Sequence, residues 1–153
     1  MKYQVYKRDL EKDSLDYVVE FFRDGLSIEV DPKDFKKDKN GKYQAIKAIH
    51  FNISHTKNFL AIAAGDKNLG LDIEERDREI DDNLSRRILK QNEEPLENSL
   101  LKTWVLKEAY SKMTGEGLKL DFRKISTDEI RGKYQVKDLS DDKLIAYVVF
   151  DVK

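Results

Sequence analysis

The spacing of hydrophobic and polar residues predicts a chain of mixed strands and helices. Period-two alternation or short apolar runs predict strands, and apolar positions three or four residues apart predict helices. By these criteria, strands are expected at residues 3–6, 26–30, 48–53, 59–64, 69–74, 122–126, 133–136 and 144–152. Helices are expected at 15–23 with Ser14 as the cap, at 83–92, and from Pro95 to about residue 113.

We expect the order of these elements to form one α+β domain. The three central strands are joined by short turns, which predicts an antiparallel meander. The longest predicted helix carries the pair Lys107 and Glu108. Because a helix followed by strands occurs twice, we expect a single domain over residues 1–153, built from two related halves at about 1–75 and 76–153.

Composition excludes several classes of function. Lys and Arg number 29 against 30 Asp and Glu, and the net charge of -1 argues against a nucleic-acid binder. The chain has no cysteine and only two histidines, which excludes thiolate chemistry and disfavours a zinc site. No apolar run approaches the roughly 20 residues that span a bilayer, and the N-terminus lacks the apolar core of a signal peptide. A cytoplasmic protein that acts away from membranes is expected.

Three carboxylates are candidates for a magnesium site. In a strand, Asp72 and Glu74 point to the same face. In a helix, Glu108 and Lys112 lie one turn apart. Mg²⁺ binds carboxylates together with phosphate oxygens, and a lysine beside it suits a phosphate. An attacking hydroxyl would need a base, for which Glu108 and Glu93 are the candidates.

Three further residues are candidate phosphate contacts. Ser54 and His55 come at the end of a predicted strand, and both can donate hydrogen bonds to phosphate. Lys42 follows the tight turn Asn40-Gly41. Taken singly, each candidate is more simply an exposed strand face, a surface ion pair, a loop histidine or a turn lysine. Their order and spacing together raise the odds of a functional site.

The order of three motifs carries a family resemblance. The motifs are Phe51-Asn52-Ile53-Ser54-His55-Thr56, Leu69-Gly70-Leu71-Asp72-Ile73-Glu74, and Trp104-Val105-Leu106-Lys107-Glu108-Ala109-Tyr110-Ser111-Lys112. In this order they resemble the 4′-phosphopantetheinyl transferases. The likeness is closer to the two-half, surfactin-synthetase-activating type, with a shortened N-terminal half, than to the short trimeric holo-acyl-carrier-protein synthases.

The resemblance implies a reaction and its metal. Such enzymes use Mg²⁺ to transfer the phosphopantetheine arm of coenzyme A to a serine of an acyl or peptidyl carrier protein, releasing adenosine 3′,5′-bisphosphate. Asp72, Glu74 and Glu108 match the family's magnesium ligands. Glu108 also matches the residue proposed to activate the serine, and Lys112 matches the lysine on the pyrophosphate.

The resemblance also assigns coenzyme and carrier contacts. Lys42, Ser54 and His55 match coenzyme A contacts, with His55 toward the 3′-phosphate. Glu93 occupies the position of a family acid, and Ile88–Leu89 would belong to the apolar surface that receives the carrier. Fatty-acid, polyketide and peptide carriers remain open, as do a monomer and a small homo-oligomer.

Two other functions compete with phosphopantetheinyl transfer. One is a non-catalytic relative that binds coenzyme A or a carrier protein. The complete acidic set with Lys112 speaks against it, because a binder has no need of a metal site. The other is a metal-dependent nucleotide hydrolase, in which water replaces the serine.

Overall fold

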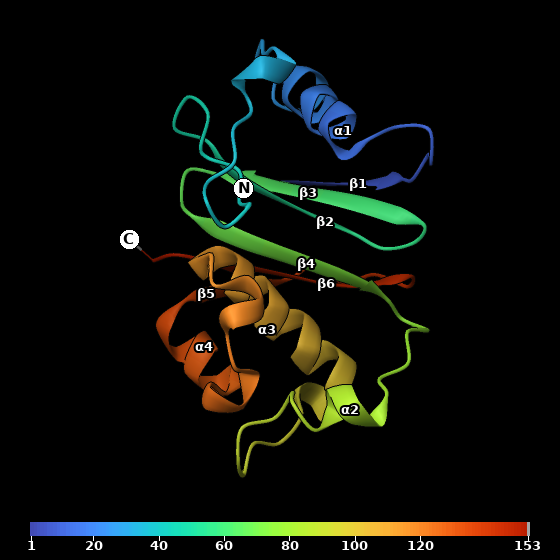
Figure 1. Ribbon diagram of the computed structural model, residues 1–153, viewed down its shortest axis with the longest axis vertical. Coiled ribbons are helices and arrows are strands. Elements are labelled where there is room, and N and C mark those ends of the chain that lie inside the picture. The colour runs from blue at the N-terminus through green and yellow to red at the C-terminus, as the bar shows by residue number, and fades with distance from the viewer. Residues whose placement is uncertain (153) are drawn as a thin grey trace.

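The computed structural model describes residues 1–152 and contains two antiparallel sheets stacked between helices (Figure 1). The first sheet has the strand order β1 (Lys2–Lys7), β3 (Phe59–Gly65), β2 (His50–His55). The second has the order β4 (Leu69–Glu75), β6 (Leu144–Phe150), β5 (Gln135–Asp138). The α-helices are α1 (Ser14–Glu20), α2 (Asp82–Ser85), α3 (Leu100–Thr114) and α4 (Thr127–Lys133). The expected α+β class is therefore confirmed.

Strand β3 is apolar throughout because both of its faces are buried. Leu60, Ile62 and Ala64 pack toward α1, in a cluster with aromatic residues of the helix region and β2. Ala61 and Ala63 pack on the other side, against apolar residues of the second sheet. A third cluster fills the space between that sheet and α3. The layers are thus α1, first sheet, second sheet, and α3 with α4 (Figure 1).

The expected meander is wrong at its third strand. β2 pairs with β3 as predicted, but β4 pairs with β6, so the turn at 66–68 carries the chain from one sheet to the other. Residues 71 and 73 of β4 pack with β6 and with the first sheet in one apolar cluster. A short turn predicts that two strands are neighbours, not that they hydrogen-bond to each other.

The structure also corrects several predicted elements. Residues 26–30 form no strand, because Ser27 has φ +55 and the Arg23 guanidinium donates to the Val30 carbonyl. Residues 122–126 contain a 3-10 turn instead of a strand, and Ser126 then caps α4. The cap of α1 is Asp13 rather than Ser14.

The predicted helical segments between 83 and 113 are shorter in the structure. The α-helical part of the first covers only Asp82–Ser85. The second begins at Leu100, capped by Ser99, after a 3-10 turn in which Glu97 has φ +49. Within residues 1–152, no helix has the length and apolar content to cross a bilayer.

Candidate active site

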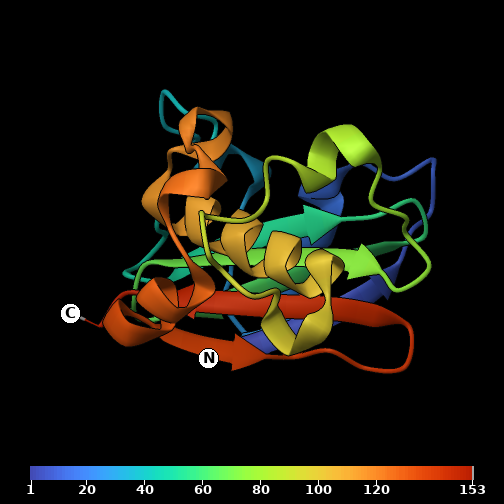
Figure 2. The same ribbon diagram turned by 90° about the horizontal axis from the view of Figure 1, so that it is seen from below.

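Close packing of α3 on β4 positions the candidate site. Figure 2 shows α3 lying across the face of the second sheet. Gly70 makes this approach possible, because a Cβ there would collide with the Ala109 carbonyl oxygen and the Met113 amide nitrogen. Alternation along β4 places Asp72 and Glu74 on the same face as Gly70. The acids of the strand therefore face the helix that carries Glu108 and Lys112.

Asp72 is the buried centre of this face, with only 6% of its surface exposed. The Lys112 Nζ lies 2.9 Å from Oδ1, and the Ser54 Oγ donates to the same oxygen at 3.1 Å. Oδ2 is buried and has no hydrogen-bond partner among the described residues. A buried carboxylate oxygen without a hydrogen-bond partner lowers the stability of the folded state. This oxygen is therefore available to bind a ligand.

The pKa values of Asp72 and of two neighbouring carboxylates are all raised. Burial raises the pKa of Asp72, although the Lys112 charge opposes the shift. Burial and then the Asp72 charge raise the pKa of Glu74 and lift the pKa of Glu108 to about 7. The three groups therefore lie close enough to repel one another when ionised.

These acids fit a hard cation by their chemistry. Carboxylate oxygens are the ligands that hard divalent cations prefer. A bound ion would reduce the repulsion between the acids and would give the Asp72 Oδ2 a partner. Within residues 1–152, however, no three His, Cys, Asp or Glu side chains are already gathered in metal-binding positions. Lys112 holds Asp72, and Arg78 forms an ion pair with Glu74.

The Asn-Ile-Ser-His segment joins the two sheets. The Asn52 Oδ1 accepts a hydrogen bond from the Leu71 amide at 2.9 Å, and the Ser54 Oγ accepts one from the Ile73 amide at 3.1 Å. Side chains of β2 thus take the place of main-chain partners along β4. Ser54 is buried, and its hydroxyl is hydrogen-bonded to both β4 and Asp72. It therefore lies beside the acids and stabilises the position of Asp72.

His55 lies on the exposed side of the same strand end. Its Nδ1 is 3.5 Å from the Arg8 Nη1, which donates to the Thr56 carbonyl at 2.6 Å. Both residues line an open cavity of about 450 Å³ that also includes Glu74 and Arg78. His55 therefore shares a cavity with one of the candidate metal ligands.

Lys42 lies at the junction of three segments. Its Nζ donates to the Asn68 Oδ1 at 2.7 Å and to the carbonyl oxygens of Leu69 and Met113 at 3.0 Å each. Burial lowers the pKa of Lys42 to about 8. The side chain lines a cleft of about 210 Å³ together with Lys112. Its hydrogen bonds join the start of β4, at Leu69, to the last turn of α3, at Met113.

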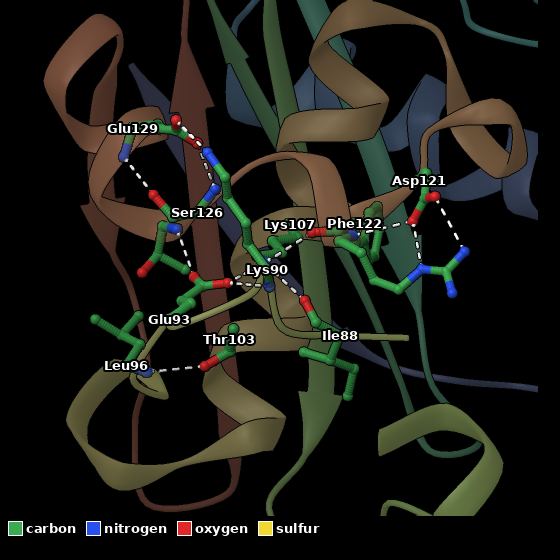
Figure 3. A network of polar contacts seen from close by, with 12 residues as sticks. Ile88, Lys90, Glu93, Leu96, Thr103, Lys107, Asp121, Phe122, Ser126 and Glu129 are labelled. Atoms are coloured by element: carbon green, nitrogen blue, oxygen red, sulfur yellow. Dashed lines mark hydrogen bonds and ion pairs between the residues drawn. The ribbon is translucent and has the colours of Figure 1, made fainter. Parts of the chain in front are cut away.

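In the part of the chain that the structure describes, the hydrogen-bond partners of Glu93 include none of the three acids, and Figure 3 shows its contacts with its neighbours. Its Oε1 accepts from the Lys107 Nζ at 2.5 Å, and its Oε2 accepts from the Thr127 amide at 2.7 Å. Lys107 is fully buried and also donates to the carbonyl oxygens of Ile88, at 2.6 Å, and Phe122, at 3.0 Å. The Lys107–Glu93 pair therefore ties α3 to the segments on both sides of it.

A groove beside Glu108 was not found by sequence reasoning. It has a volume of about 370 Å³, and its lining includes Trp104, Leu118 and Phe122. Leu118 is fully exposed, whereas Ile88, expected at the partner surface, is fully buried. The signal for Leu118 was its place in a glycine-flanked loop, where an apolar side chain has little to pack against.

Comparison with known proteins identifies the family. A model of the 4′-phosphopantetheinyl transferase superfamily matches residues 68–152, which include β4, α3 and the acids between them. The chain belongs to this superfamily.

Two curated relatives show how much of a family member this chain matches. A 4′-phosphopantetheinyl transferase from Aneurinibacillus migulanus, gsp, is 32% identical over 93 residues, covering 55% of this chain and 39% of the relative. Another from Bacillus pumilus, psf-1, is 34% identical over 95 residues, covering 55% and 40%. The chain thus matches about two fifths of the length of these curated relatives.

Proposed function

We propose that the protein transfers the 4′-phosphopantetheine arm of coenzyme A to a serine of an acyl or peptidyl carrier protein. The observation that supports the proposal is the buried Asp72, which pairs with Lys112 and keeps one carboxylate oxygen without a partner among the described residues, on the face of β4 that packs against the helix of Glu108. Membership of the superfamily supports the same reaction. We also propose that residues 1–153 form a single domain of two related halves, at about 1–75 and 76–153.

In this proposal Asp72, Glu74 and Glu108 hold Mg²⁺. When bound, the ion would neutralise pyrophosphate charge and polarise the phosphorus under attack. The serine oxygen forms a new bond to the phosphorus of the phosphopantetheine arm. The bond from that phosphorus to the adenosine side breaks, and adenosine 3′,5′-bisphosphate leaves.

The chain's own residues handle the proton and the charge. Glu108 takes the serine proton, and its raised pKa suits a group that exchanges protons near neutrality. Lys112 stabilises the negative charge on the leaving phosphate. His55, beside Arg8, and Lys42 contact coenzyme A, while Ser54 acts through Asp72.

Glu93 supports the site indirectly. Its Oε1 accepts from the Lys107 Nζ and the Lys90 amide, and its Oε2 accepts from the Thr127 amide. The side chain is only 4% exposed, so an incoming serine has little access to it. Lys107 precedes Glu108 on α3, so the pair fixes the helix turn that presents the base. We therefore assign catalysis to Glu108 and positioning to Glu93.

The carrier is proposed to dock in the groove beside Glu108. The lining of the groove includes the apolar side chains of Trp104 and Leu118 and the basic side chains of Arg87 and Lys119. An apolar residue next to the modified serine would fit the first feature, and acidic groups on the carrier would fit the second.

The test is incubation with coenzyme A, Mg²⁺ and an apo carrier protein. Mass spectrometry should show one phosphopantetheine added to the carrier, and Asp72→Asn or Glu108→Gln should abolish the gain. Glu20→Gln is the matched control, because Glu20 lies on α1 and forms its ion pair with Lys12. Lys112→Ala should lower kcat more than it raises the KM for coenzyme A.

Other outcomes separate the alternatives. Coenzyme binding without any transfer would indicate a non-catalytic relative. Release of adenosine bisphosphate without a carrier would indicate a hydrolase. Full transfer by Asp72→Asn would contradict the metal-ligand assignment.

A further inference from the structure

Arg78 is a cation that none of the preceding roles explains. It lies in the segment after β4, four residues beyond Glu74, and its Nη1 forms an ion pair with the Glu74 Oε1. Its guanidinium carbon lies 5.9 Å from the centre of the Trp104 ring. Arg78 lines the cavity of His55, whereas Trp104 lines the groove of Glu108, so Arg78 lies where the two spaces approach each other.

The charge of Arg78 acts on all three candidate metal ligands. It lowers the pKa of Asp72, Glu74 and Glu108, in each case against the larger raising effect of burial. Lys112 also acts on each of these acids, but its hydrogen bond goes to Asp72. The two cations therefore divide the strand acids between them, one ion pair each.

An arginine cannot release its partner by losing a proton, because its pKa stays far above physiological pH. Another cation can, however, take the place of Arg78 on Glu74. The side chain of Glu74 is 17% exposed and that of Arg78 is 40% exposed, so the ion pair is accessible from the cavity. The guanidinium already lies over the face of Trp104, and this cation–π contact does not depend on Glu74.

We propose that Arg78 is an internal counter-ion that occupies Glu74 in the metal-free protein and competes with the divalent cation for that carboxylate. The inference rests on the proposed metal-ligand set and adds a residue that sets metal affinity. Metal binding displaces the guanidinium from Glu74, and the existing contact with Trp104 keeps it nearby. The exchange keeps the acids partly neutralised when no metal is bound and weakens metal binding by the free energy of the ion pair.

Direct metal binding tests the proposal without any carrier or coenzyme. Mn²⁺ titrations followed by the electron paramagnetic resonance of the free ion give the dissociation constant for each variant. Arg78→Ala should bind Mn²⁺ about fivefold more tightly than the wild type, as expected for the loss of a partly exposed ion pair. Arg78→Lys keeps a positive charge and should stay near the wild-type value.

Two further variants make the result specific. Arg76→Ala is the matched control, because the Arg76 Nε donates to the Asp141 carbonyl and has no bond to Glu74. It should leave Mn²⁺ affinity unchanged. In the double variant Arg78→Ala with Glu74→Gln, the gain should disappear, because the released carboxylate is absent.

Every outcome decides the question. Tighter binding by Arg78→Ala supports the proposal, as does binding by that variant when the wild type binds no Mn²⁺. Equal or weaker binding by Arg78→Ala overturns it, and so does the absence of binding in both. If metal affinity changes as expected but the wild type transfers nothing to any carrier, the proposed function fails while the counter-ion role stands.

Discussion

Gly70 of β4 lies directly against the backbone of Ala109 in α3, with no room for a side chain between them. Gly70→Ala should therefore push α3 away from the strand and destabilise the protein by about 3 kcal/mol, the upper part of the range for overpacking. The matched control is Gly132→Ala, where an added Cβ meets nothing within 4 Å. Urea unfolding of both variants is the measurement, and equal stability of the two would contradict the packing argument.

The buried Lys107–Glu93 pair should matter more for stability than for chemistry. Lys107→Met leaves the Glu93 carboxylate buried without its charged partner, which costs about 3–5 kcal/mol. The double variant Lys107→Met with Glu93→Gln should lose less, because no charge is then buried. Thermal unfolding of the single and double variants measures the difference. A double variant as unstable as Lys107→Met would show that charge is not the cause.

The raised pKa of Glu108 predicts a pH dependence of stability. The carboxyl keeps its proton up to about pH 7 in the folded protein but loses it near 4.5 when unfolded. The folded state thus binds more protons in this window, so the contribution of Glu108 to stability falls as pH rises from 4.5 to about 7. Glu108→Gln removes this loss. In metal-free buffer it should raise Tm by a few degrees at pH 8 and have little effect at pH 4.5.

Leu118 should contribute to carrier recognition and not to the fold. Its side chain is fully exposed, so Leu118→Ser should leave Tm unchanged. The variant should raise the KM for the carrier about tenfold, in line with the loss of an apolar anchor at an interface, and leave the KM for coenzyme A as it was. Steady-state kinetics with each substrate varied in turn are the test. An unchanged carrier KM would remove the groove from the docking surface.

Ser54→Ala distinguishes a direct coenzyme contact from support of Asp72. The variant removes a donor to Asp72 and an acceptor of the Ile73 amide, which should cost about 1–3 kcal/mol of stability. If Ser54 acts through Asp72, metal affinity should fall while binding of metal-free coenzyme A is retained. Weakened coenzyme binding without metal would instead favour the direct contact.

The sequence predicted local elements better than their partners. Alternation and apolar runs located β1, β3 and β4, because a strand with one buried face has apolar residues at every second position and a strand buried on both faces is apolar throughout. The pairing of β4 with β6 depends on residues about 75 positions apart along the chain, and no local pattern records it. The false strand at 26–30 shows the same limit, since an alternating segment there is held by Arg23 and by the left-handed Ser27.

The acids of the proposed site could be suggested from sequence because their spacing follows the periods of a strand and a helix. Period two put Asp72 and Glu74 on one face, and Glu108 and Lys112 came from a helical turn. The roles given to Ser54 and Glu93 could not be checked in this way. Their partners, Ile73 and Lys107, become visible only when strands from different sheets and distant loops are placed in space.

The hydrogen bonds that the Asn52 and Ser54 side chains accept from the amides of β4 have an evolutionary consequence. Main-chain hydrogen bonds between strands can form with almost any side chain present. The contact between β2 and β4 instead requires a side-chain amide at position 52 and a hydroxyl at position 54. Replacement of either residue would loosen one sheet against the other while each remained intact. Natural variation at these two positions is therefore expected to be far narrower than at the surrounding strand residues.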